Sequence, residues 1–357
     1  GYQSCYWCYR MKQDTFSDDN SAALINDNFL PILIDRELEP HLDSQLQQIL
    51  AEQRGVGGWP ANVILTPEGY PVASFSYADP DNLIPGLSGL LERRDSEPAQ
   101  LVSEGRAILA RLEQEKEASE RLLSDTSLAD LLQRFLQQSN AAADTTNGGF
   151  GDSEKYPHLP QLQALLALTA VVPDASITGF IRTTLDAMLQ QGLRDQLGGG
   201  FFRYTTDRQW RTPHYEQMLH TQALAIQVLM RAGNQLREQR YTDAAEAVLL
   251  NMLRAFRRDD GLFRSSLSAV GNDGKDGGHY LWQPSVLETL LGPEWQGQLD
   301  VLVTTPDGIL PRLEAGVPDT VRMKLLNRRE QQAPPGDDKA LLGLNGLVLS
   351  ALAAAET

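Results

Sequence analysis

Cys5 and Cys8, separated by Tyr6 and Trp7, are the residues of this chain best suited to chemistry, and they are its only cysteines. A chain with no other thiol has no disulfide framework to build. The Cys-x-x-Cys spacing therefore indicates a dithiol that opens and closes during a reaction. We expect Cys5 to be the exposed, attacking sulfur and Cys8 to be the resolving sulfur.

Other interpretations of the pair stay open. A structural disulfide across so short a loop would remove little unfolded-state entropy. A zinc site would need two further ligands, but the five histidines include no suitably spaced pair near the motif, and His214 and His220 are too far apart for one. An inert or vestigial pair is the remaining alternative. We expect no metal ion and no cofactor.

The elements around the pair must position it. Helical periodicity from Tyr9 to Asn28 places the motif at a helix N-terminus, where N–H groups and the helix dipole favour a thiolate and lower the pKa of Cys5. The apolar run 30–35 predicts a buried strand, and a helix extends to about residue 53. Residues 62–65 predict a second strand, followed by a turn at 67–69. This is the order of elements in thioredoxin.

Pro60 follows the glycine-rich segment 55–58 and leads into the second strand. In the thioredoxin order it is the cis-proline that faces the dithiol and presents backbone to a substrate. Trp7, Gly58, Trp59 and Pro60 are therefore the expected substrate-binding residues, with Trp7 packed beside the motif. The alternative is an ordinary turn proline, since most X-Pro bonds are trans.

Several segments resemble the spermatogenesis-associated protein 20 family, which has bacterial members of the YyaL type. They include GYQSCYWC at 1–8, GGWP at 57–60, LTPEG at 65–69, GGFG at 148–151, DQLGGGF at 195–201 and PHYEQML at 213–219. The resemblance covers nearly the whole chain. It implies a thioredoxin fold joined to a toroid of paired helices, similar to the (α/α)6 barrels of N-acylglucosamine 2-epimerases and several glycosidases.

The sequence of the second part of the chain agrees with a domain of paired helices. Helical patterns recur at 100–119, 125–139, 160–172, 176–192, 215–233, 241–257 and 339–355. We predict a thioredoxin-like α/β domain at 1–97 and an all-α, toroid-like domain at 98–357. The helices make about half of a full toroid and only four residues precede Cys5, so we expect a fragment that is incomplete at both ends.

Loops of the helical domain carry aromatic residues suited to stacking on sugar rings, and His214 and Glu216 suit acid or base roles. The expected pocket residues are Phe150, Tyr156, Phe201, Tyr204, Trp210, His214 and Glu216. A glycosidase needs two carboxylates at one bond. Where the family carries an acidic stretch, this chain has residues 267–270, Leu-Ser-Ala-Val, so hydrolase or epimerase activity is not expected. The plain alternative is that these residues have a packing role and bind no ligand.

The dithiol also departs from the family. Tyr6 and Tyr9 stand where histidines are common, and tyrosine cannot stabilise a thiolate as an imidazolium does. The helix end, with Arg10 and Lys12 nearby, is left to do so. We therefore expect a reducing, thioredoxin-like dithiol.

The sequence thus predicts a thiol-disulfide oxidoreductase that acts on a protein or small thiol or disulfide substrate. A rival hypothesis is a non-catalytic scaffold that binds a glycan or a protein and whose dithiol is regulatory or vestigial. The net charge of −16 argues against nucleic acid and anionic membranes as partners, and no apolar run is long enough to span a membrane. The compartment stays open, with the cytoplasm favoured over the periplasm or secretion.

Overall fold

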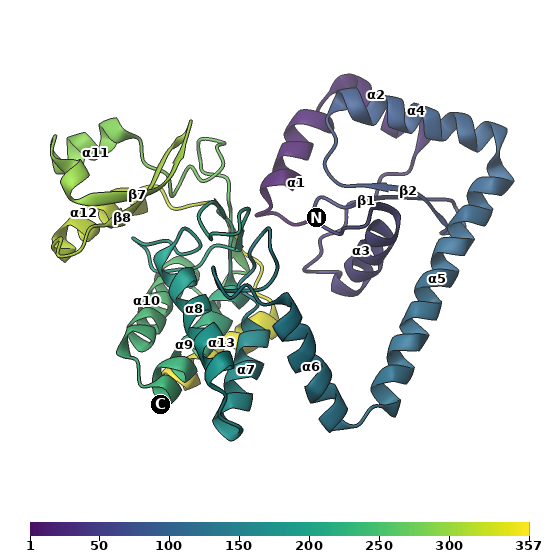
Figure 1. The fold of residues 1–357 in the computed structure, drawn as a ribbon. Coiled ribbons are helices and arrows are strands. Elements are labelled where there is room, and N and C mark those ends of the chain that lie inside the picture. Colours follow the sequence, from purple (N-terminus) through teal and green to yellow (C-terminus); the bar gives the residue numbers. More distant parts are fainter. Residues whose placement is uncertain (357) are drawn as a thin grey trace. The chain divides into compact units, whose positions relative to one another are not determined.

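The computed structural model describes residues 1–356, apart from the side chains of residues 123–125. Contacts divide the chain into two compact units, Gly1–Arg134 and Phe135–Thr357 (Figure 1). The predicted boundary at residues 97 and 98 falls inside the first unit, between helices α4 (Pro80–Ser96) and α5 (Pro98–Asp125). Helix α5 contacts the sheet and the helices before it, so the first unit includes it.

The first unit is a small α/β structure. Strands β1 (Asn62–Leu65) and β2 (Pro71–Phe75) pair antiparallel, and β1 is the strand predicted at 62–65. The helices before them are α1 (Tyr6–Arg10), the π-helical turn η1 (Met11–Thr15), α2 (Asp19–Asn28) and α3 (Pro40–Arg54). The single helix predicted from Tyr9 to Asn28 is thus interrupted. Asp18 starts a new helix because its side chain accepts a hydrogen bond from the Ser21 N–H at 2.8 Å.

The prediction of a buried strand at residues 30–35 is wrong. Among the described residues this segment belongs to no strand, and Leu30, Ile32 and Leu33 are 85%, 75% and 97% exposed. Its end runs beside Gly1, whose amino group donates to the Ile34 carbonyl at 3.1 Å. An apolar run predicts burial only where another layer of the structure covers it, and no such layer covers these three side chains.

The second unit is mainly helical. Its larger helices are α6 (Leu128–Ala142, which begins in the first unit), α7 (Leu159–Val171), α8 (Ala175–Gln190), α9 (Leu219–Leu236), α10 (Gln239–Ala255) and α13 (Leu342–Ala355). Each of the helical segments predicted beyond residue 98 overlaps a helix. The predicted order, an α/β domain followed by a domain of paired helices, is therefore found in the structure.

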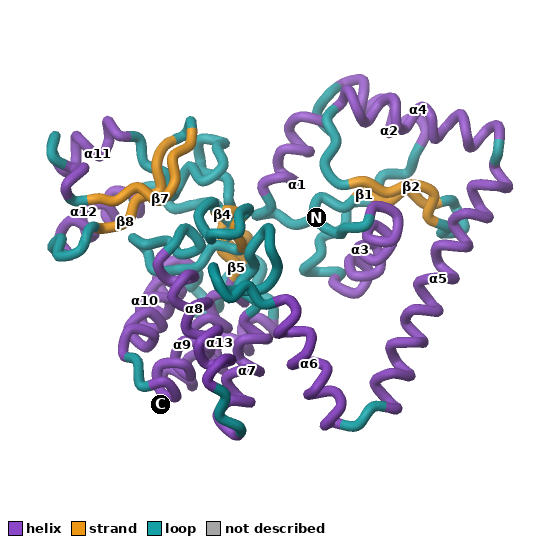
Figure 2. The backbone as a smooth tube through the Cα atoms, in the orientation of Figure 1, coloured by secondary structure: helices purple, strands orange, loops and turns teal. Residues whose placement is uncertain are grey.

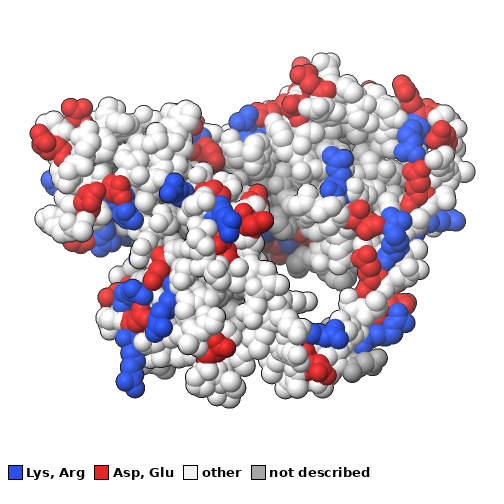
Figure 3. Space-filling model, in the orientation of Figure 1, with Lys and Arg blue, Asp and Glu red and all other residues white. Residues whose placement is uncertain are grey.

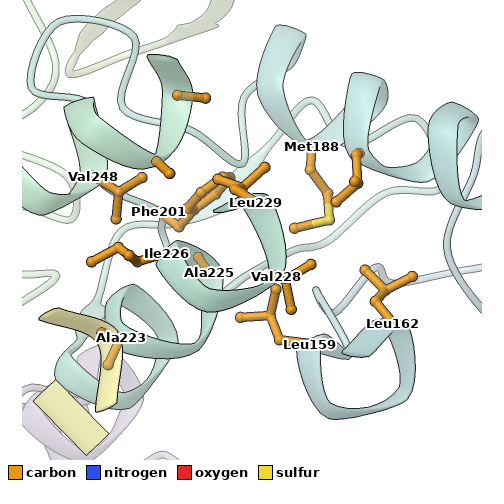
Figure 4. Packing of buried hydrophobic residues seen from close by; sticks show 14 of the residues in the cluster. Leu159, Leu162, Met188, Phe201, Ala223, Ala225, Ile226, Val228, Leu229 and Val248 are labelled. Atoms are coloured by element: carbon orange, nitrogen blue, oxygen red, sulfur yellow. The ribbon is translucent and has the colours of Figure 1, made fainter. Parts of the chain in front are cut away.

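Helix α9 forms the centre of this unit, in contact with α7, α10 and α13. It is buried on most of its surface, and residues such as Ile226, Val228 and Leu229 interdigitate with Met188 and Val248 from neighbouring helices (Figure 4). Each buried aliphatic side chain stabilises the fold by about 1.5–3 kcal/mol. This core fixes the positions of the loops at the ends of the helices.

Short strands pair with one another and so connect those loops (Figure 2). Strand β3 (Tyr204–Thr205) pairs with β4 (Pro213–His214), and β5 (Gln217–Met218), β6 (Ser266–Leu267) and β9 (Gly336–Asp337) form a second small sheet. All three strands of that second sheet are buried or partly buried. The loops next to these strands hold the candidate site residues of this unit.

A further segment was not predicted from the sequence. It contains α11 (Pro284–Leu291), η2 (Trp295–Gly297), the hairpin β7 (Leu299–Thr305) and β8 (Gly308–Leu313), and α12 (Asp319–Glu330). A buried ion pair joins α12 to the loop after α8, since Arg329 Nη2 lies 2.7 Å from Asp195 Oδ2 and Arg329 Nη1 lies 3.0 Å from Asp195 Oδ1. Burial opposes ionisation of Asp195, but the Arg329 guanidinium holds the pKa of that carboxyl below its usual value.

Candidate functional site

The two cysteines lie at the start of α1. Cys5 is the N-cap residue, and its sulfur accepts a hydrogen bond from the Cys8 N–H at 3.2 Å. A backbone N–H directed at sulfur stabilises a thiolate there, so this geometry favours Cys5 as the charged partner.

The loop before β1 covers the Cys5 sulfur. Cys5 Sγ lies 4.0 Å from the Trp59 carbonyl oxygen, and the Trp59–Pro60 bond is cis, as the thioredoxin order predicted. Gly58 is fixed by the Gln47 side chain, which donates to the Gly58 carbonyl at 2.9 Å and accepts from its N–H at 2.8 Å. The structure therefore brings the predicted residues Cys5, Gly58, Trp59 and Pro60 together.

The Trp59 ring is held by neighbouring polar and cationic side chains. Its Nε1 donates to Asp43 at 2.9 Å, and the Arg36 guanidinium lies 4.3 Å from the ring centre. Trp7 instead packs against Tyr77, with ring centroids 5.1 Å apart, and remains 42% exposed. Of the two tryptophans, Trp7 thus offers the larger exposed aromatic surface beside the motif.

Two expectations about the dithiol are corrected. Cys5 was expected to be exposed, but it is only 2% exposed, while Cys8 is half-buried. The cause is the Trp59 loop, which lies over the N-cap position. Arg10 was expected to help stabilise the thiolate, but its guanidinium is 2.6 Å from the Asp14 carboxylate, which neutralises its charge locally.

The predicted pocket of the helical unit does not form as one surface. Phe201 and Trp210 are completely buried, because Phe201 belongs to the main core and the Trp210 Nε1 donates to the Asn147 carbonyl at 3.0 Å. Phe150 packs against Phe180, with ring centroids 5.2 Å apart. These three aromatic residues therefore have the packing role that was the plain alternative.

The other predicted pocket residues do lie together. Tyr156 stacks on Tyr204 with ring centroids 4.6 Å apart, and Tyr204 stacks on His214 at 4.8 Å, so the three rings form an aromatic column. Tyr156 is 37% exposed, whereas His214 is buried. The column therefore leads from the surface to the buried Glu216, whose Oε1 lies 3.8 Å from His214 Nδ1.

Charge is balanced around Glu216 by Arg203, whose Nη1 lies 3.3 Å from Glu216 Oε2. Burial lowers the pKa of His214, an effect that Glu216 opposes and Arg203 reinforces. His214 is therefore neutral near pH 7. Burial also raises the pKa of Tyr204, so this hydroxyl stays protonated.

Sequence reasoning missed a second carboxyl at this place. Asp276 lies in the loop after β6, close enough for its charge to interact with Glu216 and with the Tyr215 hydroxyl. Burial, followed by the charges of Glu216 and Asp307, raises the pKa of Asp276 to about 7. The expectation that this domain lacks a carboxylate pair did not anticipate Asp276, and the only signal was the glycine-rich hairpin GNDGKDGG at 271–278.

Metal binding finds no support in the described geometry. Among the side chains that the structure describes, no three of the His, Cys, Asp or Glu type are grouped so that they could hold an ion. No helix in residues 1–356 is long and apolar enough to cross a membrane. On the face drawn in Figure 3, basic and acidic side chains are interspersed over much of the surface. One such pair joins α4 to α5, since Arg93 Nη2 lies 3.0 Å from Glu104 Oε2.

Comparison with known proteins connects the chain to one family. Residues 1–104 match a family model described as Thioredox_DsbH, "Protein of unknown function, DUF255". Spermatogenesis-associated protein 20 of Rattus norvegicus is 31% identical over 310 residues, which cover 82% of this chain. The chain is a relative of spermatogenesis-associated protein 20. The predicted resemblance is thereby confirmed.

The human spermatogenesis-associated protein 20 is 30% identical over 312 residues. In both comparisons the matched region is 39% of the relative, so this chain spans about two fifths of the length of these curated relatives. Among solved structures, the cellobiose 2-epimerase from Spirochaeta thermophila is 15% identical with a TM-score of 0.34, covering 67% of this chain and 70% of the epimerase.

Proposed function

We propose that the first unit is a thiol-disulfide oxidoreductase that uses Cys5 and Cys8. The observation that carries this proposal is the hydrogen bond from the Cys8 N–H to the Cys5 sulfur, directly beside the Trp59 carbonyl and Pro60. This hydrogen bond favours the nucleophilic form of Cys5. The neighbouring backbone lies where an extended substrate segment would align.

The reaction follows from the two sulfurs. The Cys5 thiolate attacks one sulfur of a substrate disulfide, which forms a mixed disulfide and releases one substrate thiolate. Cys8 then attacks the Cys5 sulfur, breaks the mixed disulfide and releases the second substrate thiolate. The dithiol is oxidised to a Cys5–Cys8 disulfide, and two electrons pass to the substrate, which is a protein or a small disulfide.

Insulin reduction with dithiothreitol as the electron donor tests this proposal. The wild-type chain should accelerate precipitation of the insulin B chain, and Cys5→Ser should not. Because Cys5 is more buried than Cys8, trapping must identify the attacking residue: Cys8→Ser should accumulate a mixed disulfide with substrate, and Cys5→Ser should not. A wild-type rate equal to that of Cys5→Ser would contradict the proposed activity.

A further inference from the structure

An exposed aromatic surface lies beside the dithiol. Trp7 stands between Cys5 and Cys8 in the chain, and it is 42% exposed. Cys5 caps α1, so all three residues lie in the first turn of that helix, which advances by about 5.4 Å. A peptide joined to either sulfur therefore passes close to the indole. The exposed part of Trp7 belongs to the surface that such a peptide meets.

Two tyrosines hold the Trp7 ring in place. The Tyr6 ring meets it edge-on, with ring centroids 5.2 Å apart, and the Tyr77 ring lies tilted against it at 5.1 Å. Tyr77 belongs to the segment after β2, and the buried Thr15 hydroxyl fixes this segment to η1 by donating to the Ala78 carbonyl at 2.7 Å. The rings of Tyr6, Trp7 and Tyr77 thus form an aromatic shelf built from two separate segments.

One ion pair braces both tyrosines of the shelf. Arg10 Nη1 donates to the Tyr6 hydroxyl at 3.2 Å, and the Tyr77 hydroxyl donates to Asp14 Oδ2 at 3.3 Å. Arg10 and Asp14 in turn contact each other at 2.6 Å. The charge of Arg10, which the sequence analysis gave to the thiolate, therefore helps to hold the shelf. Because the ion pair is neutral as a whole, the shelf presents an uncharged aromatic face.

Such a shelf suits an apolar side chain. Tryptophan and tyrosine rings bury a large apolar area and interact favourably with a further aromatic ring. Because the rings are already held in position, little side-chain freedom is lost when a partner binds. Next to Cys5, the Trp59 carbonyl and Pro60 offer backbone to an extended chain. A peptide would use both features, whereas a small hydrophilic disulfide has no apolar side chain to place on the shelf.

We propose that the aromatic shelf selects peptide substrates with an apolar or aromatic residue beside the disulfide-bonded cysteine. This proposal rests on the thiol-disulfide exchange proposed above and names its substrate class. The substrate cysteine bonds to the Cys5 sulfur while the neighbouring apolar side chain covers the Trp7 indole. The peptide disulfide is reduced to two thiols, and Cys5 and Cys8 are oxidised to a disulfide. Trp7 acts through binding, so its loss should change the selectivity between substrates.

The test compares two synthetic peptides, each a dimer joined by one disulfide. One carries phenylalanine on both sides of the cysteine, and the other carries serine there. The prereduced chain is mixed with each peptide, and the released peptide thiols are measured after an acid quench. For the wild type, the second-order rate constant should be about tenfold larger with the phenylalanine peptide, which corresponds to about 1.4 kcal/mol. Trp7→Ala should bring this ratio close to one, and Trp7→Phe should keep most of it.

Two controls separate selectivity from a general loss of activity. Phe16→Ala is the matched variant, because Phe16 is also 42% exposed but lies at the end of η1, and it should keep the wild-type ratio. Reduction of oxidised glutathione, a small hydrophilic disulfide, should be equally fast in the wild type and in Trp7→Ala. Equal wild-type rate constants for the two peptides, or a ratio that Trp7→Ala leaves unchanged, would overturn the proposal.

A binding measurement distinguishes this proposal from the redox activity on which it rests. Both peptides are made with alanine in place of cysteine, and NMR follows the indole N–H signal of Trp7, which is assigned by its absence in Trp7→Phe. The phenylalanine peptide should shift this signal, and the serine peptide should not. A shift without peptide reduction would contradict the oxidoreductase activity and support the shelf as a binding surface. Reduction of both peptides at equal rates without a shift would overturn the shelf alone.

Discussion

The two candidate sites of this chain are built in different ways. At the dithiol, the polar contacts to the Cys5 sulfur come from backbone groups, the Cys8 N–H and the Trp59 carbonyl, and the reactive residues are adjacent in sequence. In the helical unit, side chains from distant segments meet, as Glu216 and Asp276 do. The first site depends on local geometry, whereas the second depends on the packing of the whole unit. Substitutions that damage one site should therefore spare the other.

The largest expected effect is on the dithiol. Cys5→Ser should lower the insulin-reduction rate to that of the buffer, because serine cannot form the mixed disulfide. The urea unfolding curve of the helical unit should not change. If Cys5→Ser also lowered the stability of the helical unit, the two sites would not be independent.

The next effect concerns the buried ion pair of the helical unit. Arg329→Met should destabilise this unit by about 3–5 kcal/mol, because it leaves the Asp195 carboxylate buried without its partner. Urea unfolding followed by circular dichroism measures the change. The double variant Arg329→Met with Asp195→Leu should recover part of the loss. Insulin reduction by the dithiol should stay at the wild-type rate in both variants.

A smaller effect should appear as a dependence of stability on pH. Because the pKa of Asp276 rises from 3.8 to about 7 on folding, the native state holds a proton that the unfolded chain releases between these values. The stability gained from this proton is complete below about pH 4 and is lost as the pH rises through 7. The loss is at most about 4 kcal/mol, from three pKa units at about 1.4 kcal/mol each.

Asp276→Asn removes this titration, so its unfolding free energy should change less across the same pH range. Urea unfolding at half-unit pH intervals measures both curves, with Asp273→Asn as the control. Parallel curves for Asp276→Asn and the wild type would show that Asp276 does not titrate in this range.

The smallest effect is expected at Arg10. Its guanidinium is paired with Asp14, so Arg10→Gln should not measurably change the pH at which Cys5 reacts with iodoacetamide. A shift of that pH to a higher value would show that Arg10 stabilises the thiolate, which would make the dithiol less dependent on backbone groups than the structure indicates.

The same contrast explains which features the sequence could predict. Cys5, Cys8 and Pro60 were recognisable because their spacing and order indicate their roles, and the cis peptide bond agrees with that order. Helical periodicity placed α7 to α10 within a few residues, because each buries an apolar stripe or is buried throughout.

Features that depend on tertiary packing could not be read in this way. Asp276 lies near Glu216 because Gly277 packs on Tyr215. The glycine-rich sequence at 271–278 indicates a turn, but nothing in the sequence pattern indicates the ring on which that turn packs. Phe201 and Trp210 were predicted to line a pocket, since an aromatic residue in a glycine-rich loop fits a core and a pocket equally well. The burial of Cys5 depends on the Trp59 loop, whose position the motif alone does not determine.

The exposed residues Leu30, Ile32 and Leu33 have a consequence for the behaviour of the chain at high concentration. Three exposed aliphatic side chains within four residues provide apolar surface that a second copy of the chain can contact. The net charge of −16 opposes this, because like-charged molecules repel one another. Added salt shortens the range of that repulsion. Light scattering should therefore show self-association that increases with ionic strength.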